Sequence, residues 1–425
     1  MVDYVDLNYK PTEDDLIVMY YVEKTPECVD FEKACAEIAK ESSIGTWTEV
    51  ATLSADIAKR LRPSVFYIDA KRNLVQIAYS KELFEIDNMP QVLSAIAGNI
   101  YGMKVLNNLR LLDITFPKAF IELYKGPKFG IEGIRKLTRV RNRPLLGTIV
   151  KPKVGLNEKE HAQVCGEAWL GGLDIVKDDE NLTNMTFNNF KLRIEETLRI
   201  RDKIEQETGE KKIYMPNITA KTSVMKKRAD EVIENGGEYI MVDILTVGFS
   251  ALQEIRDYLE NEKIVIHAHR AMHAALTRNK KHGMTMLSLA KIMRLIGMDQ
   301  LHTGTIVGKM EGEKQEVLEI NKVITEKTVK GNEITNLNQD WGKLKPILPV
   351  ASGGLSPLHV PDLIENFGTD VVFQFGGGCH GHPKGTTEGA TAIRQAIDAT
   401  LEGSTLIDYA KTHEELKLAV EKWQH

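Results

Sequence analysis

From about Leu145 onward, apolar and polar positions follow one another along the chain in a repeated order. A short apolar run leads into a polar loop, an amphipathic helical segment and glycine, and then another apolar run begins. This order is typical of parallel β/α units. In one unit Asn157 can cap a helix whose third position is Glu160, and Gly171-Gly172 can end that helix. The pattern therefore predicts strands that alternate with helices.

Eight apolar segments repeat in this way, and each predicts one strand. They are centred near residues 148, 175, 213, 241, 266, 302, 350 and 373. Eight such units are typical of a (β/α)₈ TIM barrel, with a doubly wound open sheet as the alternative. The tail from about Gly389 has a helical pattern, and we expect it to close the barrel or to pack beside it.

The beginning of the chain lacks this repeat. It mixes a helical segment at 31–41 with strand-like segments at 64–69 and 74–78, which predicts a separate α+β domain. We therefore expect an α/β protein with an N-terminal α+β domain at 1–130 and a TIM-barrel catalytic domain with C-terminal helices at 131–425. At 425 residues, 42% of them hydrophobic, the chain is long enough to give each domain its own core.

Composition excludes some classes of partner and location. The formal net charge of -5, from 55 basic and 60 acidic residues, leaves no broad basic surface for nucleic acid or a membrane. No apolar run approaches the roughly 18 residues that span a bilayer, and the first residues do not resemble an export signal. The four cysteines, at positions 28, 35, 165 and 379, form no C-x-x-C pair. We expect a soluble cytoplasmic protein.

Charged residues gather directly after the first two barrel strands. The active site of a TIM barrel lies at the C-terminal ends of its strands, so these residues are candidates for chemistry. Alternation at period two puts Lys151 with Lys153 on one face, and Lys177 with Asp179 on another. Glu180 follows in the loop. Two carboxylates beside a lysine form an oxygen-rich site that suits magnesium.

Glycines follow the last two predicted strands, at Gly353-Gly354 and at 376–378. Their backbone N–H groups can approach an anion closely, and this is the usual phosphate site of a TIM barrel, so we expect a phosphorylated substrate. Each feature alone is more often an ordinary turn or a solvated helix entrance. Their convergence after six of the eight predicted strands indicates an active site. We expect His267 to be a structural core residue and assign no role to His273 or His282.

Taken in order, these strand endings resemble the large chain of ribulose-1,5-bisphosphate carboxylase/oxygenase (RuBisCO), of the archaeal form III type. The resemblance lies in 147–153 (GTIVKPK), 171–181 (GGLDIVKDDEN), 267–274 (HAHRAMHA), 302–313 (HTGTIVGKMEGE), 351–354 (ASGG) and 374–383 (QFGGGCHGHP). Two segments of the first domain, 41–48 (ESSIGTWT) and 98–102 (GNIYG), resemble the family's N-terminal active-site segments. The resemblance covers nearly the whole chain.

The resemblance implies a magnesium-dependent carboxy-lyase. It would carboxylate ribulose-1,5-bisphosphate with CO₂ to give two 3-phosphoglycerate, and would oxygenate the same substrate with O₂. Lys177 is similar to the lysine that a separate CO₂ molecule converts to a carbamate. This carbamate, Asp179 and Glu180 would then bind Mg²⁺, and the carbamate would remove the C3 proton.

Four further side chains take catalytic or tuning roles from the resemblance. Lys151 would donate and accept a proton near C2. Lys153 would tune it, because neighbouring ammonium groups lower one another's pKa. His269 would serve hydration on the O3 side, and Lys309 would close a loop over the substrate and stabilise the incoming carboxylate.

The resemblance also implies the residues that hold the substrate. One phosphate would meet Gly354, Gly376, Gly377, Lys309 and, from a neighbouring subunit, Thr46 and Trp47. The other would meet Arg270, His302 and Ser352, while Gly353 and Gln374 also line the site. Because Glu41, Thr46, Trp47 and Asn99 would complete a partner's site, a homodimer or an assembly of dimers is expected, without a small subunit.

Two positions separate this chain from the commonest family pattern. Ile149 stands where the family commonly has a substrate-contacting threonine, and Thr148 beside it faces the other way. Cys379-His380 in the last glycine motif favours the archaeal form. That form implies a role in nucleotide (AMP) salvage.

Two other functions are compatible with parts of the pattern. A RuBisCO-like enolase or isomerase would share the barrel and metal site, but it has no need of a lysine such as Lys309 that steadies a new carboxylate. A phosphate-binding barrel without catalysis would tolerate loss of the cluster formed by Lys177, Asp179 and Glu180, which is intact.

Overall fold

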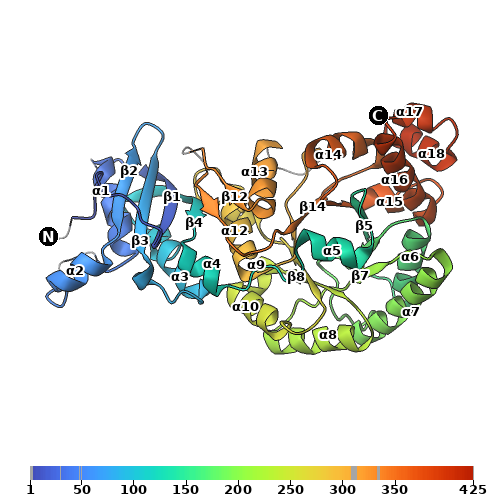
Figure 1. Cartoon of the computed structure of the whole chain (residues 1–425), viewed down its shortest axis with the longest axis horizontal. Coiled ribbons are helices and arrows are strands. Elements are labelled where there is room, and N and C mark those ends of the chain that lie inside the picture. The colour runs from blue at the N-terminus through green and yellow to red at the C-terminus, as the bar shows by residue number, and fades with distance from the viewer. Residues whose placement is uncertain are drawn as a thin grey trace. The chain divides into compact units, whose positions relative to one another are not determined.

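The computed structural model describes residues 3–28, 30–46, 48, 50–307, 314–332 and 336–424. They form two compact units (Figure 1). The first unit comprises Met1–Gly126, Met272–Gly297 and Glu326–Leu344, and the second comprises Pro127–Ala271, Met298–Thr325 and Lys345–His425. Along the described parts of the chain, no helix is both long enough and apolar enough to cross a membrane.

The first unit is built on a five-stranded sheet in the order β10-β4-β1-β3-β2. Its strands are β1 (Asp15–Lys24), β2 (Ser64–Asp69), β3 (Leu74–Ser80), β4 (Leu106–Thr115) and β10 (Gly283–Met284). The helices are α1 (Phe31–Glu41), α2 (Ala55–Leu61), α3 (Met89–Ile96), α4 (Lys118–Leu123), α11 (Ala274–Thr277) and α12 (Met286–Ile296), with a small hairpin of β12 (Thr328–Val329) and β13 (Gln339–Asp340). The predicted helix at 31–41 and strand at 64–69 are confirmed, and the strand predicted at 74–78 continues to Ser80.

A buried ion pair joins α12 to the sheet of the first unit. Lys291 of α12 and Asp113 of β4 lie 2.6 Å apart, Nζ to Oδ1, and both side chains are buried. Lys291 Nζ also donates to the carbonyl oxygen of Ile114. Because two buried charges need each other and further hydrogen bonds, this pair fixes where α12 lies on the strand.

The second unit contains an eight-stranded parallel sheet in the order β7-β6-β5-β15-β14-β11-β9-β8. The strands are β5 (Leu145–Ile149), β6 (Ile175–Lys177), β7 (Ile213–Met215), β8 (Tyr239–Asp243), β9 (Val265–His269), β11 (Gln300–His302), β14 (Leu348–Ser352) and β15 (Val372–Phe375). A parallel bridge from Asn217, just after β7, to Met241 of β8 closes the sheet. The predicted (β/α)₈ barrel is confirmed, and the open-sheet alternative is wrong.

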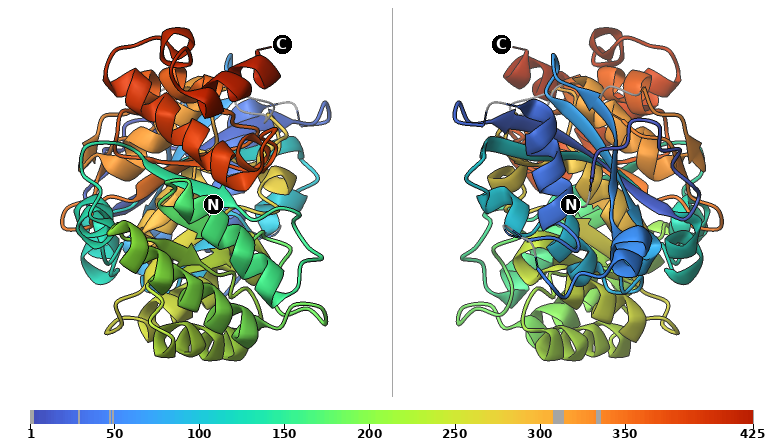
Figure 2. Two further views of the ribbon diagram at one scale, coloured as in Figure 1. Left: turned by 90° about the vertical axis from the view of Figure 1, so that its right-hand side faces the viewer. Right: turned by 90° about the vertical axis from the view of Figure 1, so that its left-hand side faces the viewer.

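Helices surround the barrel strands (Figures 1 and 2). They are α5 (Gly130–Thr138), α6 (Glu158–Leu170), α7 (Phe190–Thr208), α8 (Thr222–Glu234), α9 (Ile244–Val247), α10 (Phe249–Tyr258), α13 (Lys314–Thr325), α14 (Val360–Phe367), α15 (Gly377–His380), α16 (Thr386–Leu401), α17 (Leu406–Tyr409) and α18 (Glu414–Trp423). The predicted capping box is present on α6, where Asn157 and Glu160 each accept from the other's backbone N–H. The tail is helical as predicted, and α16 packs against α6.

An apolar cluster fills the interior of the barrel at the N-terminal end of its strands. Side chains from the beginnings of the strands form one cluster with two residues of α5, which lies across the middle of the ring in Figure 1. The cluster includes Ile131, Ile134, Leu145, Ile175, Ile213, Tyr239, Val265, Leu348 and Val372. Helix α5 therefore seals the N-terminal end of the barrel.

Candidate active site

Lys177 is the last residue of β6 and is 1% exposed. Its Nζ donates to the Asp178 carbonyl oxygen at 2.6 Å and lies 3.3 Å from Sδ of Met241 across the barrel. Burial lowers the pKa of the Lys177 ammonium group, although the carboxylates of Glu180 and Asp179 oppose this effect. The chain thus holds a lysine that gives up its proton more readily than one in water.

Asp178 faces away from this interior and anchors the segment that carries the metal-ligand candidates. Its carboxylate accepts from Arg193 at 3.1 Å, from the Tyr214 hydroxyl at 2.6 Å and from the Asn217 backbone at 3.0 Å. Burial would raise the pKa of Asp178, but the Arg193 guanidinium and His161 hold it well below its usual range. The segment after β6 is therefore tied to α7 and β7 by a fully ionised carboxylate.

Asp179 and Glu180 meet the two lysines that follow β5. Lys151 Nζ is 2.8 Å from Asp179 Oδ2, and Lys153 Nζ is 3.3 Å from Glu180 Oε1. Burial raises the pKa of Asp179, but the hydrogen bond and charge of Lys151 bring it below its usual value. The Glu180 and Asp179 carboxylates raise the pKa of Lys153.

His269 ends β9 and is oriented by a carboxylate that the sequence analysis did not single out. Its Nδ1 lies 2.7 Å from Asp243 Oδ1, at the end of β8, and its Nε2 lies 3.9 Å from Glu180 Oε2. Burial lowers the pKa of His269, and Asp243 opposes this shift. With Asp243 accepting from Nδ1–H, the neutral ring presents Nε2 as a proton acceptor. The period-two pattern of β8 could have placed Asp243 on the same interior face.

Two further histidines lie beside His269 inside the barrel. The His267 ring is fully buried, its Nδ1 lies 3.0 Å from Gln300 Oε1, and its Nε2 has no hydrogen-bond partner among the described residues. The His302 ring contacts both His267 and His269, with ring centroids 4.9 and 4.8 Å apart. Its Nε2 is buried and has no hydrogen-bond partner among the described residues, and the same is true of both amide atoms of Gln374. Such atoms are available to a ligand or water.

The turns after β14 and β15 are in direct backbone contact. Gly353 and Gly354 have φ of +128° and +68°, a conformation that favours glycine. A Cβ atom on Gly378 would lie 2.1 Å from the Leu355 carbonyl oxygen, so glycine is also required there. This close packing gathers Ser352 at the end of β14 and Gly376-Gly377 after β15 into one glycine-rich surface.

Arg270 follows His269 and supplies a positive charge. Its Nη1 donates to the Thr303 carbonyl oxygen at 3.3 Å. Burial lowers the pKa of the guanidinium to about 10, so it stays protonated at neutral pH. Arg270 can therefore pair with an anionic ligand.

The remaining predicted residues are placed elsewhere or are not described. Glu41 ends α1, Thr46 follows it, and Asn99 opens a short helical turn at Asn99–Gly102, all in the first unit. Trp47 and Lys309 lie outside the described residues. His273 and His282 are also in the first unit. His273 Nδ1 lies 2.9 Å from Thr277 Oγ1, and His282 Nδ1 accepts from the Leu109 backbone N–H.

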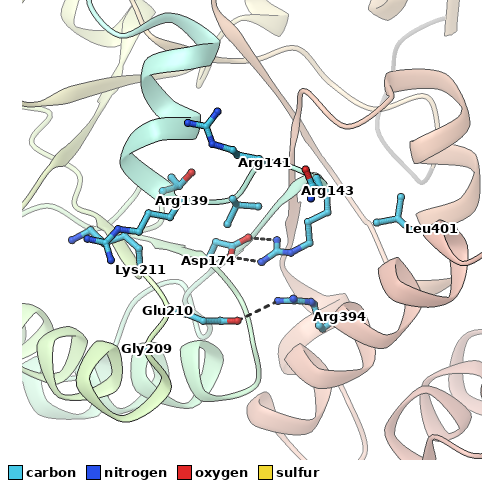
Figure 3. A pocket seen from close by; sticks show the side chains of 12 residues that line it. Arg139, Arg141, Arg143, Asp174, Gly209, Glu210, Lys211, Arg394 and Leu401 are labelled. Carbon is cyan, nitrogen blue, oxygen red and sulfur yellow. Dashed lines mark hydrogen bonds and ion pairs between the residues drawn. The ribbon is translucent and has the colours of Figure 1, made fainter.

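A cavity of about 440 Å³ lies at the opposite end of the barrel (Figure 3). There Arg143 binds Asp174 through two bonds of 2.6 and 2.7 Å, and Arg394 pairs with Glu210 at 3.9 Å. These residues precede β5, β6 and β7 or belong to α16, so the cavity is at the N-terminal end of the strands. In a TIM barrel this face contributes stability rather than chemistry.

Two family profiles match the chain. Residues 130–423 match "Ribulose bisphosphate carboxylase large chain, catalytic domain", and residues 3–120 match "Ribulose bisphosphate carboxylase large chain, N-terminal domain". The ribulose bisphosphate carboxylase of Methanosarcina mazei is 53% identical over 423 residues, which is 99% of both chains. That of Methanocaldococcus jannaschii is 52% identical and both chains are fully covered.

Solved structures of archaeal Rubisco have the same fold. The dimeric Rubisco of Hyperthermus butylicus superposes with a TM-score of 0.94 at 41% identity, covering 99% of this chain and 98% of the other. The octameric Rubisco of Pyrococcus horikoshii, in complex with sulfate ion, superposes with a TM-score of 0.92 at 48% identity. It covers 99% of this chain and 96% of the other.

Proposed function

The chain belongs to the ribulose bisphosphate carboxylase large-chain family, and from this premise we propose that it carboxylates ribulose-1,5-bisphosphate to two molecules of 3-phosphoglycerate. The observation that carries the proposal is the grouping of buried Lys177 with Lys151, Asp179 and Glu180 at one end of the barrel. Acid, base and anionic ligand groups converge there, as in a working site. Oxygenation, with O₂ in place of CO₂, is part of the same proposal.

The donor atoms at this end fit Mg²⁺ if Lys177 is carbamylated. In the described part of the chain no three His, Cys, Asp or Glu side chains gather as ligands of one metal, so the two carboxylates need another oxygen donor. Attack of the neutral Lys177 amine on CO₂, with loss of a proton, would give an anionic carbamate. The lowered pKa of Lys177 favours this step. Bound there, Mg²⁺ would act as a Lewis acid for charge that develops on the substrate.

The lysines and the histidine then take distinct proton-transfer roles. An oxygen of the Lys177 carbamate would accept the C3 proton of the substrate. Lys151, once Asp179 binds the metal rather than this ammonium group, would exchange a proton near C2. His269, kept neutral by burial and oriented by Asp243, would accept a proton on the O3 side during hydration.

Backbone and cationic groups would hold the two phosphates. Gly354, Gly376 and Gly377 present N–H groups to one of them, helped by Lys309. Arg270, His302 and Ser352 would hold the other, and the free amide of Gln374 together with Gly353 lines the site. Lys309 would also stabilise the carboxylate as it forms.

Completion of the site by a second copy of the chain is also part of the proposal. The N-terminal domain, 1–130, would supply Glu41, Thr46, Trp47 and Asn99 to the partner's barrel domain, 131–425. A homodimer is then the smallest active unit, and an assembly of dimers is equally compatible, since archaeal relatives are dimeric or octameric. No small subunit is needed. The cellular role that we propose is carboxylation of ribulose bisphosphate from nucleotide (AMP) salvage in the cytoplasm.

Fixation of ¹⁴C-bicarbonate into acid-stable product tests the proposal. The wild-type chain is activated with bicarbonate and Mg²⁺, supplied with ribulose-1,5-bisphosphate under anaerobic conditions, and compared with Lys177→Ala and Lys309→Ala. We expect 3-phosphoglycerate from the wild type and a loss of more than about 100-fold in both variants. Lys159→Ala, an exposed lysine on α6, is the matched control and should retain full activity. Folded, activated wild type that fixes no carbon would instead favour an enolase-type reaction.

A further inference from the structure

His380, at the end of α15, joins three elements of the barrel and has no role in the mechanism above. Its Nε2 lies 2.9 Å from Thr148 Oγ1, and its Nδ1 lies 3.1 Å from Thr386 Oγ1. Thr148 is in β5, and Thr386 is the first residue of α16. A single side chain therefore links a barrel strand, the glycine turn after β15 and a C-terminal helix.

The directions of these hydrogen bonds follow from the available protons. Thr148 Oγ1 donates its proton to the Phe375 carbonyl oxygen at 2.6 Å, so it accepts from Nε2–H of His380. Nδ1 of the neutral ring then accepts from the Thr386 hydroxyl. Burial lowers the pKa of His380 to about 4, a hydrogen bond with the Ile149 backbone opposes this shift, and the Lys151 charge adds a smaller lowering effect. One neutral tautomer thus satisfies the whole chain of bonds at neutral pH.

Helix α15 is also fixed by backbone contacts on two sides. A Cβ on Gly378 would lie 2.1 Å from the Leu355 carbonyl oxygen, and a Cβ on Gly389 of α16 would lie 2.0 Å from that of Cys379. These contacts leave no room for α15 to shift toward α16 or the turn after β14. The Thr148–His380 bond adds a link in the third direction, toward β5.

The Thr148–His380 bond lies at the end of the β5–β15 ladder, where the segment that carries Lys151 and the glycine turn begin. The β5–β15 ladder has its last pair at Thr148 and Phe375. Beyond it, the chain after β5 leads to Lys151 and the chain after β15 leads into the glycine turn. The Lys151 stem still crosses the turn, since its Cε is 3.6 Å from the position of a Cβ on Gly376. The bond from Thr148 to His380 spans this divergence.

We propose that His380 is a positioning residue that holds the Lys151 end of β5 at a fixed distance from the N–H groups of Gly376 and Gly377. The inference rests on the proposed function, which gives Lys151 and the glycine turn their roles. A phosphate held by the turn places the reacting carbon relative to Lys151. A misplacement of about 1 Å can lower the rate about 100-fold without loss of binding. His380 therefore acts on kcat and not on the affinity for the bisphosphate.

The test compares kcat and KM for ribulose-1,5-bisphosphate in activated wild type and His380→Leu, which nearly keeps the side-chain volume and removes the hydrogen bonds of the imidazole ring. We expect kcat to fall at least about tenfold, KM to stay within about threefold, and the thermal midpoint to change little. His380→Gln can still donate to Thr148 and should recover part of kcat. Thr148→Val combined with His380→Leu should lower kcat no further than His380→Leu alone, because both remove the same link.

A matched control and the contrary outcomes separate this role from a structural one. His382→Leu removes a buried histidine of the same turn that bonds the Glu415 carbonyl oxygen in α18, and its kcat should equal that of wild type. If kcat of His380→Leu stays within about twofold, or falls only with the folded fraction, the inference is overturned. If His380→Leu does not fold, Thr148→Val, which removes the acceptor of the same link, takes its place under the same criteria. Wild type that fixes no carbon overturns the proposed function and this inference together.

Discussion

Burial and neighbouring charges together set the ionisation states of the side chains in the site. Lys177 is made a weaker base by burial, while Asp178 beside it stays ionised against Arg193 and Tyr214. His269 is kept neutral by burial and oriented by Asp243. The proposed catalytic residue and the residue that supports it are therefore either adjacent in the chain, as Lys177 and Asp178 are, or on neighbouring strands, as His269 and Asp243 are.

The Asp243→Asn variant tests this division at His269. The amide can still accept from Nδ1–H, but it removes the negative charge that opposes the effect of burial on the pKa of His269. That pKa is already below 6.5 and should fall further, because the charge that raised it is gone. The acid limb of kcat should move to lower pH, and kcat at neutral pH should fall about tenfold because His269 is a weaker base.

The pH dependence of ¹⁴CO₂ fixation measures this effect. Asp362→Asn, which removes an exposed carboxylate on α14, is the control and should leave the profile unchanged. An acid limb that stays in place or moves to higher pH in Asp243→Asn would show that His269 is not the group that titrates.

Alternation along the strands predicted part of the site at the scale of residues. It placed Lys177 with Asp179 and Lys151 with Lys153, and the structure brings Lys151 and Lys153 onto the Asp179–Glu180 pair. It could not supply Arg193, which is 15 residues from Asp178 on α7, or the 26-residue pairing of Asp243 with His269. These partners meet only through the packing of separate β/α units.

Helix α12 shows how an element is fixed by a single buried pair. All eleven of its residues are buried, and Lys291 reaches Asp113 on β4. Burial raises the pKa of Asp113 even though Lys291 and two backbone N–H groups oppose this, so the carboxylate depends on the lysine for its charge. The position of α12 in the first unit therefore rests on a pair whose members are both costly to bury alone.

Lys291→Met should accordingly destabilise the protein by about 3–5 kcal/mol, because it leaves Asp113 buried without a counter-charge. Urea unfolding followed by circular dichroism measures the loss. The exposed pair of Lys81 and Asp14, 2.8 Å apart, is the matched control, and Lys81→Met should cost less than about 1 kcal/mol. Equal losses in the two variants would contradict the importance of burial for this pair.

At the scale of elements, the hydrophobic pattern was a good guide to local structure. All eight predicted barrel strands are present, and helix α1 has the predicted bounds. The pattern could not assign α12 to a unit, because a helix that is buried on all sides can belong to either core. Nor could it reveal α15, a four-residue helix within a glycine motif that otherwise indicates only a turn.

For the whole molecule, the two ends of the barrel have separate tasks. The C-terminal end holds the ionisable groups of the proposed mechanism, and the N-terminal end holds α5 and the ion pairs around the cavity of Figure 3. Arg143 and Asp174 are both buried there, and Asp174 also accepts from the Leu146 backbone. This distribution predicts that stability and activity can be changed independently.

Asp174→Asn is the variant that tests this separation. It should lower the thermal midpoint, because Arg143 keeps a buried charge with only a neutral partner, while kcat at a temperature where the protein is folded should stay within about twofold of wild type. Differential scanning calorimetry and carbon fixation on the same sample measure the two quantities. A loss of kcat without a loss of stability would show that the N-terminal end of the barrel also contributes to chemistry.

Helix α5 also limits the route by which small molecules can reach the interior of the barrel. Because Ile131 and Ile134 pack into the apolar layer at the N-terminal end of the strands, the barrel can be entered only from the C-terminal end. Lys177 is buried at the end of β6. On the proposed function, a CO₂ molecule that modifies it would pass the place where the sugar bisphosphate would bind. On the proposed function, the CO₂ that modifies Lys177 would have to enter before the sugar bisphosphate, and sugar bound first would slow this activation.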